Sequence, residues 1–161
     1  MDTLDAIRKR RSVRQFRSGD VPRQDLETIV DAGRLAPTGY NRQPWDFIVV
    51  TEKSTISNFN IIYAWLETVP ALIVVVMDKS SDWWVEDGAA AIENMLLAAT
   101  ALGYGSCWVE GDAMPYEENI KSLLGIPSDR HVMAVIPVGI PGEVPKPPKK
   151  SLQKVLHWEK Y

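Results

Sequence analysis

The spacing of hydrophobic and polar residues predicts a chain in which helices and strands alternate. Apolar residues that recur every three to four positions indicate helices, and short apolar runs between turn residues indicate strands. The predicted helices are residues 2–10, 22–36, 55–68, 87–102 and 115–124, and the predicted strands are residues 45–51, 71–77, 104–110 and 132–138. Because the two kinds of element interleave, the pattern predicts an α/β or α+β fold.

Individual residues define several of these boundaries. Pro22 suits the first position of a helix, and Pro37 ends the same helix, since proline has no amide hydrogen to donate. Asp87 is expected to cap the fourth helix, and Gly103 to end it. Pro137 cannot donate to a sheet ladder, so we expect the last strand to lie at an edge or to end near this proline.

Two segments are too apolar to be exposed on either side. Residues 71–77 (ALIVVVM) show no alternation, which predicts a strand buried on both faces. The helix over 87–102 is rich in alanine and leucine and has little polar face. The sheet can cover one side of this helix. The other side is covered either by a second subunit, as the seam of a homodimer, or by the rest of the same chain, and the composition leaves both alternatives open.

Composition and charge narrow the class of protein. The chain has 161 residues, 45% hydrophobic and 24% charged, as expected for one soluble domain over residues 1–161. Its net charge of −3 argues against nucleic acid binding. The longest apolar run is too short to span a bilayer and the first residues lack a signal-peptide pattern, so we expect no membrane association and a cytoplasmic location. One cysteine and two widely spaced histidines predict no metal site.

The segment 10–14 (RRSVR) carries the first candidate chemistry. If its backbone is extended, Arg10, Ser12 and Arg14 share one face, because side-chain direction repeats every second residue. Guanidinium groups pair with two phosphate oxygens at once, and a hydroxyl can donate a third hydrogen bond. The pattern therefore indicates a socket for the phosphate of a small cofactor. The alternative is a solvated basic run that complements a helix C-terminus.

Four segments of the chain resemble the nitroreductase family of FMN-dependent oxidoreductases, and together they cover most of it. They are residues 7–16 (IRKRRSVRQF), 36–50 (APTGYNRQPWDFIVV), 87–111 (DGAAAIENMLLAATALGYGSCWVEG) and 138–150 (VGIPGEVPKPPKK), the last followed by 152–161. The resemblance implies an α+β fold, a three-layer α/β/α sandwich around a mostly antiparallel sheet. It also implies a swapped-arm homodimer, with FMN at the subunit interface and NADH or NADPH as co-substrate.

The resemblance further implies which residues bind FMN. Arg10, Arg11, Ser12 and Arg14 are expected to hold its phosphate and ribityl chain. Lys149, with Lys150 as second choice, is expected to bring a second positive charge to the phosphate from the proline-rich arm, whose extended backbone points adjacent side chains in opposite directions. The other arm lysine, Lys146, is expected to be solvated. The closing segment implies anchors on the partner subunit at Val155, Leu156 and Trp158.

The flavin ring is expected to lie against two further segments. Pro37, Thr38 and Gly39 are implied to reach the flavin bound by the other subunit, with Asn41 and Gln43 near the isoalloxazine; the alternative is a polar turn. Val109, Glu110 and Gly111 are implied to lie beneath the ring, where the Gly111 amide donates toward the flavin N5. Trp45 is expected to belong to the core, and Cys107 to be a buried structural thiol.

The implied reaction is electron transfer from NADH or NADPH to nitroaromatic, quinone or related small acceptors, with ping-pong kinetics and no catalytic side chain. The alternatives are an FMN-binding sensor or store, and a flavin-destructase or dehalogenase relative. The connection over 52–86 is short, which argues against a flavin-destructase or a dehalogenase, because such relatives need a specialised lid over the flavin. Its aromatic residues, Tyr63, Trp65, Trp83 and Trp84, are assigned with equal weight to a wall over the flavin or to core and dimer surface.

Overall fold

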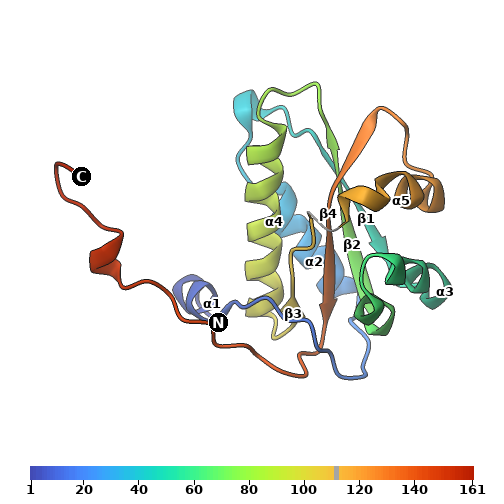
Figure 1. Ribbon diagram of the computed structural model, residues 1–161, viewed down its shortest axis with the longest axis horizontal. Coiled ribbons are helices and arrows are strands. Elements are labelled where there is room, and N and C mark those ends of the chain that lie inside the picture. The colour runs from blue at the N-terminus through green and yellow to red at the C-terminus, as the bar shows by residue number, and fades with distance from the viewer. Residues whose placement is uncertain (111–112) are drawn as a thin grey trace.

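The computed structural model describes residues 1–110 and 113–161 of the chain (Figure 1). Its helices are α1 (Thr3–Lys9), α2 (Arg23–Arg34), α3 (Lys53–Ile56), α4 (Trp84–Ala101) and α5 (Glu117–Leu124), with short 3-10 turns η1 (Gly39–Asn41), η2 (Ser57–Ile61), η3 (Ala64–Thr68), η4 (Met114–Tyr116) and η5 (Leu152–Lys154). The strands are β1 (Trp45–Val50), β2 (Ala71–Asp78), β3 (Gly105–Ser106) and β4 (Arg130–Gly139), in the sheet order β1-β2-β4-β3. Every neighbouring pair in this sheet is antiparallel.

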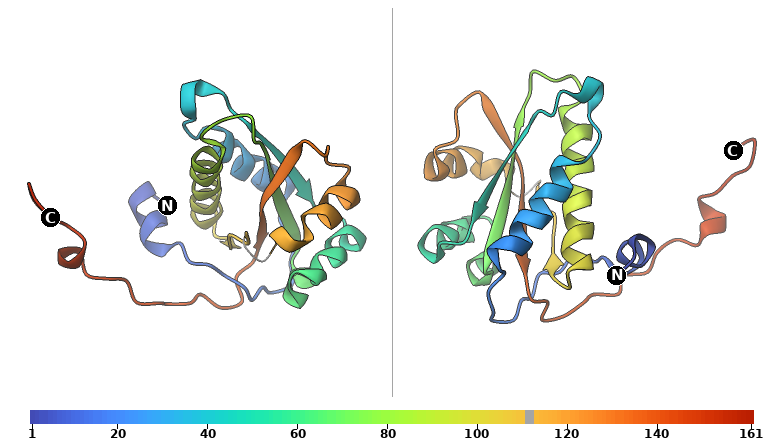
Figure 2. Two further views of the ribbon diagram at one scale, coloured as in Figure 1. Left: turned by 45° about the horizontal axis from the view of Figure 1, so that its top comes forward. Right: turned by 180° about the vertical axis from the view of Figure 1, so that it is seen from behind.

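Helices cover both faces of the sheet, so the predicted α+β three-layer sandwich is confirmed. Figures 1 and 2 show α2 and α4 on one face, and α3 and α5 on the other. Alternate residues of β2 belong to two separate cores: Leu72 and Val74 pack with Phe59 and Leu66, whereas Ile73 and Val75 pack with Ile92 and its neighbours. This double burial explains why the β2 sequence does not alternate.

The long helix α4 begins three residues before the position predicted from its capping residue. Trp83 occupies the N-cap and Asp87 lies in the first turn, so the prediction that Asp87 caps this helix is wrong. The inner side of α4, including Ile92, Met95 and Ala99, is fully buried against α2 and the sheet. Its opposite side, including Ala90 and Leu97, is only half-buried. One chain therefore covers only part of this apolar helix.

The connection predicted as one helix over 55–68 is broken into α3, η2 and η3. Asparagine and β-branched isoleucine, which this stretch repeats, are poor formers of regular helix. Phe59 and Leu66 still reach the core, since both are 1% exposed or less. None of the described helices is both long and apolar enough to cross a membrane.

Pro137 shortens the third strand rather than placing the fourth at an edge. The strand β4 lies between β2 and β3, so the edge alternative was wrong, but β4 ends at Gly139, two residues after Pro137, as the other alternative predicted. The Val135 amide donates to the Val109 oxygen (2.8 Å), and Pro137, two residues later, turns its nitrogen toward the same neighbour. It has no hydrogen to donate. The strand predicted over 104–110 is accordingly reduced to Gly105–Ser106 and one isolated bridge at Val109.

The C-terminal arm leaves the body after pairing with the segment that follows α1. Phe16 bridges Pro141 in antiparallel fashion, and the Gly142 amide donates to the Gln15 oxygen (2.7 Å). Residues 144–147 of the arm still line a cavity with α1, and the arm then extends away from the other elements (Figures 1 and 2). The three predicted anchors are exposed: Val155 by 56%, Leu156 by 42% and Trp158 by 78%.

Candidate FMN site

The segment after α1 is extended and lies beside β3. Ser12 forms a parallel bridge with Ser106, and the Val13 amide donates to the Ser106 oxygen (2.9 Å). Val13 is buried. A Cβ on Gly105 would lie only 2.9 Å from the Val13 Cβ, so the close approach of the two segments requires a glycine there.

The side chains of Arg10, Ser12 and Arg14 lie around the thiol of Cys107, as an extended backbone requires. Burial raises the pKa of the Cys107 thiol, while the charge of Arg14, a hydrogen bond with Ser12 and the charge of Arg10 oppose that rise. The thiol itself is 1% exposed, in agreement with its prediction as a buried structural group. The structure thus brings two guanidinium groups and a hydroxyl to one face.

Glu93 of α4 orients Arg10, a contact that the sequence did not indicate. The Nε of Arg10 lies 3.1 Å from the Glu93 carboxylate, and the Arg10 side chain is 23% exposed. An ion pair through Nε leaves the outer edge of the guanidinium for a ligand. No carboxylate among the described residues pairs with Arg14. The donor set at this face, two guanidinium groups and a hydroxyl, fits a phosphate.

Arg11 is separated from this set. Its Nη1 donates to the backbone oxygens of Arg8 (2.8 Å) and Arg10 (2.6 Å), at the C-terminal end of α1. Cations stabilise helix C-termini because the free carbonyl groups carry partial negative charge. Arg11 therefore complements a helix C-terminus, as the alternative interpretation of the basic run proposed. The binding of Arg11 to a phosphate remains a prediction.

The strand end beneath the predicted flavin ring is only partly described. Val109 exchanges two backbone hydrogen bonds with Val135 (3.0 and 2.8 Å), which fixes its backbone against β4. The Glu110 oxygen accepts from the amides of Ala113 (2.8 Å) and Met114 (3.2 Å). Gly111, to which the amide donor was assigned, lies outside the described residues.

The loop that contains Pro37, Thr38, Gly39, Asn41 and Gln43 connects α2 to β1. The Gly39 amide donates to Asp87 in the first turn of α4 (3.0 Å). The Gln43 amide donates to the Thr38 hydroxyl (3.2 Å), which closes the loop on itself. Trp45, at the start of β1, packs against the core, as predicted.

Within one chain, this loop lies at the N-terminal end of α4, whereas the basic face runs from the middle of that helix, where Arg10 pairs with Glu93, to beyond its C-terminal end, where Ser12 bridges Ser106. The loop is joined to Asp87 in the first turn, and Gly105, which contacts Val13, follows the last turn. Figures 1 and 2 show the loop and α1 at the two ends of the helix. The rise from Asp87 to Ala101 is about 21 Å at 1.5 Å per residue. The two predicted halves of the cofactor site are therefore far apart in a single chain.

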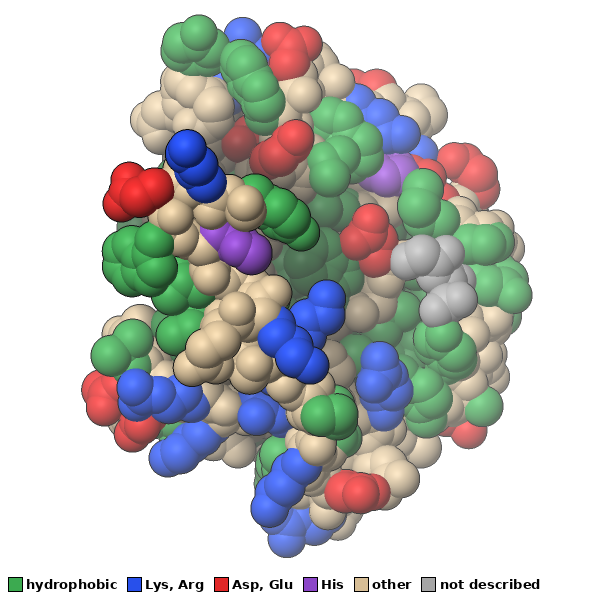
Figure 3. All heavy atoms as spheres, turned by 60° about the vertical axis from the view of Figure 1, so that its left-hand side comes forward, with side chains coloured by type: hydrophobic (Ala, Val, Ile, Leu, Met, Phe, Trp, Pro, Cys, Tyr) green, Lys and Arg blue, Asp and Glu red, His purple; other side chains and the backbone are tan. Residues whose placement is uncertain are grey.

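The arm lysines are not brought to the basic face. Lys149 and Lys150 are exposed on the arm, which extends away from the body (Figure 1). Figure 3 shows the side of the molecule from which the arm extends. Most of the lysine and arginine side chains visible in this view lie in its lower half. Arg8, Arg11 and Lys146 line a cavity of about 500 Å³ between α1 and the arm. Lys146 is exposed, in agreement with its prediction as a solvated residue, although it lies beside the body rather than on a free tail.

The four aromatic residues of the short connection occupy two separate places. Tyr63 and Trp65 stack on each other, with ring centroids 5.8 Å apart, and pack against the core on the α3 side of the sheet. Trp83 contacts Tyr40 (5.4 Å), and Trp84 contacts His131 (4.9 Å). In this chain they do not form one continuous wall.

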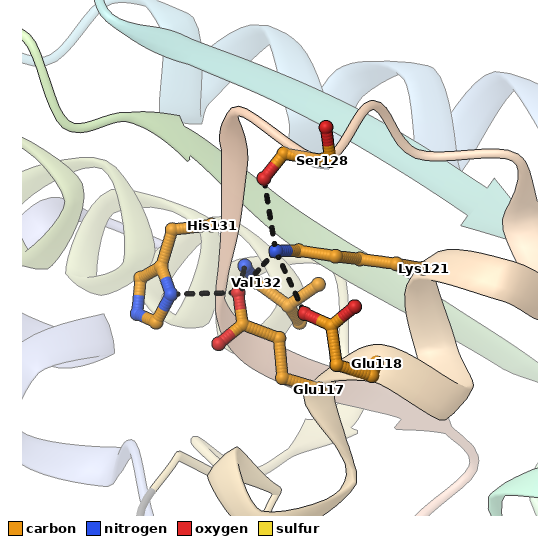
Figure 4. Close-up of polar contacts among 6 residues, drawn as sticks. All are labelled: Glu117, Glu118, Lys121, Ser128, His131 and Val132. Atoms are coloured by element: carbon orange, nitrogen blue, oxygen red, sulfur yellow. Dashed lines mark hydrogen bonds and ion pairs between the residues drawn. The ribbon is translucent and has the colours of Figure 1, made fainter.

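A buried polar cluster fixes α5 onto the start of β4 (Figure 4). The Glu117 carboxylate lies 2.8 Å from Nδ1 of His131 and 3.1 Å from Nζ of Lys121, and it accepts from the Val132 amide (3.1 Å). Burial alone raises the pKa of Glu117, but the hydrogen bonds from Lys121, Val132 and His131 outweigh burial and hold that pKa below its ordinary value.

The lowered pKa of Glu117 predicts a loss of stability in acid. A carboxylate with a lowered folded-state pKa stabilises the protein above its unfolded-state pKa, near 4.3, and this stabilisation is lost as pH falls through the folded pKa. Glu117→Gln is expected to lower the free energy of unfolding by about 1–3 kcal/mol at pH 7. The difference from the parent protein should shrink toward pH 3, as measured by urea unfolding.

Glu118→Gln is the matched control, because Glu118 also pairs with Lys121 (3.2 Å) but its side chain is 84% exposed. Its effect is expected within about 0.5 kcal/mol. A Glu117→Gln variant that is as stable as the parent at pH 7, or whose deficit is equal at both pH values, contradicts this account.

Comparisons with known proteins agree with the fold and with the order of the motifs. The family model described as the nitroreductase family matches residues 7–62 and 59–140. A protein of Archaeoglobus fulgidus named "Putative NADH dehydrogenase/NAD(P)H nitroreductase" is 38% identical over 151 residues, which cover 87% of this chain and 86% of that protein. The chain belongs to the nitroreductase family.

Two solved structures extend the likeness to nearly the whole chain. The crystal structure of a protein with the same name from Bacteroides thetaiotaomicron VPI-5482 superposes with a TM-score of 0.89 at 30% identity, covering 99% of this chain and 98% of that one. An FMN-dependent nitroreductase from Clostridium difficile R20291 superposes with a TM-score of 0.87 at 30% identity, covering 98% and 99%.

Proposed function

We propose that this chain is an FMN-dependent oxidoreductase that passes electrons from NADH or NADPH to nitroaromatic, quinone or related small acceptors. The observation that carries the proposal is the face formed by Arg10, Ser12 and Arg14, in a chain of the nitroreductase family. The 30% identical C. difficile structure is described as an FMN-dependent nitroreductase. FMN, when bound, supplies hydride transfer between the nicotinamide and the acceptor.

The residues of the chain bind and orient the cofactor rather than react themselves. Arg10 and Arg14 neutralise its phosphate, and the Ser12 hydroxyl donates a further hydrogen bond. Asn41 and Gln43 offer both donors and acceptors to the edge of the ring. The backbone of Val109 and Glu110 approaches the ring from below, and an amide donor at this end of the segment would stabilise negative charge that develops on the ring.

We propose that the working unit is a homodimer in which each FMN contacts both subunits. Three observations support this assignment. Ser12 lies beside Ser106, beyond the last turn of α4, whereas the loop over 37–43 meets the first turn, so a loop from a second subunit would bring both to one cofactor. The outer side of α4 includes apolar residues, Ala90 and Leu97, that one chain only half-buries. The arm exposes Val155, Leu156 and Trp158, which need a surface to cover them.

Anaerobic absorption spectroscopy of the purified protein with FMN tests the proposal. The protein is expected to bind FMN with bands near those of the free cofactor. NADH or NADPH should bleach these bands faster than it bleaches the same concentration of free FMN, and a quinone should restore them. Bound FMN that neither nicotinamide reduces would identify a sensor or store instead, and a protein that binds no FMN would refute the proposal entirely.

A further inference from the structure

The loop over 38–43 is held in a conformation that its own residues disfavour. Tyr40, Asn41 and Gln43 all have left-handed backbone angles, with φ of 52°, 56° and 51°. Residues with a Cβ other than asparagine and aspartate rarely adopt this region, because the Cβ crowds the following carbonyl oxygen. Such a loop persists only where neighbouring groups stabilise it.

Two residues at the start of α4 supply that support. Asp87 accepts the Gly39 amide (3.0 Å) although it lies 48 residues further along the chain, and it is only 4% exposed. The ring of Trp83 packs so closely on Gly39 that a Cβ there would collide with it. Tyr40 lies against the same ring (5.4 Å), and Arg42 covers both aromatic rings from 5.8–5.9 Å.

The carboxylate of Asp87 is not explained by folding alone. Its second oxygen, Oδ2, is buried and has no hydrogen-bond partner among the described residues. A buried polar atom without a partner destabilises the fold, because it loses its hydration and gains no hydrogen bond in exchange. An apolar residue at this position would avoid that penalty, but it would release the Gly39 amide. The contact that Asp87 makes with the loop is therefore its distinctive contribution.

We propose that Asp87 is a positioning residue for the cofactor: it fixes the Gly39 amide inward, so that Asn41 and Gln43 are presented to the flavin ring. This inference rests on the proposed function, because it takes the loop as part of the FMN site. Asp87 acts through the loop and does not itself contact the cofactor. An acceptor oxygen at this position is the property required, and a negative charge is not.

Three substitutions separate these properties. Asp87→Leu removes the acceptor, and we expect the Kd for FMN, measured by quenching of flavin fluorescence, to rise about tenfold. Amide exchange at Gly39 in the FMN-loaded protein should quicken by a similar factor. Asp87→Asn keeps an acceptor oxygen, and both quantities should stay within about threefold of the parent values. Asp87→Ala replaces Asp87→Leu if the leucine variant does not fold.

Two controls account for charge and for stability. Glu86→Leu removes an exposed carboxylate from the same helical turn and should leave the Kd unchanged. Ile136→Val removes a buried methylene remote from the loop and should lower the melting temperature without altering the Kd.

The outcomes distinguish this inference from the function on which it rests. If the parent protein quenches no flavin fluorescence, the proposed function fails. If the parent binds FMN and Asp87→Leu binds it equally well, the positioning role alone fails. The role also fails if Asp87→Asn is as weak as Asp87→Leu, because the acceptor oxygen would then not be the property that matters.

Discussion

Arg14→Ala is expected to weaken FMN binding about ten- to a hundredfold, because one charge-assisted hydrogen bond to a phosphate contributes about 1.5–3 kcal/mol. Arg14 is the better test of the basic face than Arg10, since Arg10 also pairs with Glu93 and its loss would disturb α4. Arg14 is exposed, so its truncation should leave the melting temperature of the FMN-free protein nearly unchanged.

The measurement is a titration of FMN-free protein with FMN, followed by flavin fluorescence at two salt concentrations. The parent should lose affinity as salt rises, and Arg14→Ala should lose less, since one phosphate contact is already missing. Arg8→Ala is the control, because it removes an equal charge from a side chain that is 71% exposed on α1. Equal FMN retention by the parent and Arg14→Ala would remove Arg14 from the site.

Trp158→Asp is expected to raise the dissociation constant of the homodimer about a hundredfold. Trp158 is 78% exposed in a single chain, and a tryptophan that anchors an interface typically contributes 2 kcal/mol or more, to which the buried charge of aspartate adds. Since each FMN is proposed to contact both subunits, the variant should also lose FMN as it dissociates.

Sedimentation velocity over a range of protein concentrations, recorded at a flavin absorption band and at 280 nm, measures both effects together. Ser151→Asp adds the same charge at an exposed polar position of the arm and should leave the dimer intact. A Trp158→Asp monomer that still carries flavin would contradict the shared site, even if the arm proved to be the dimer contact.

The two halves of the proposed site differ in how they could be predicted. The common face of Arg10, Ser12 and Arg14 follows from the two-residue repeat of an extended backbone, a local property that the sequence carries. The separate direction of Arg11 follows from the same repeat, but its use as a cap on α1 depends on where that helix ends. The family resemblance assigned Arg10, Arg11, Ser12 and Arg14 alike to FMN, because a match between sequences does not show in which direction each side chain points.

The contacts that hold the basic face and the loop in place could not be predicted from the sequence. Glu93 pairs with Arg10, and Asp87 accepts the Gly39 amide, across more than 45 residues of sequence. Local pattern assigned Asp87 to the cap of α4, because an acid before an apolar helical run has that appearance. Only the packing of the loop against the helix shows that the Asp87 carboxylate accepts a hydrogen bond from a different segment, the loop at Gly39.

By itself the local pattern of the sequence determined the interleaving of helices and strands, the double burial of residues 71–77 and the common face of Arg10, Ser12 and Arg14, because each depends on periods of two or of three to four residues. The layered α+β sandwich was implied by the family resemblance. The tertiary structure alone decided the sheet order, the shortening of β3 opposite Pro137, and the separation of the loop from the basic face along α4. These features depend on contacts between distant segments, which no local period encodes.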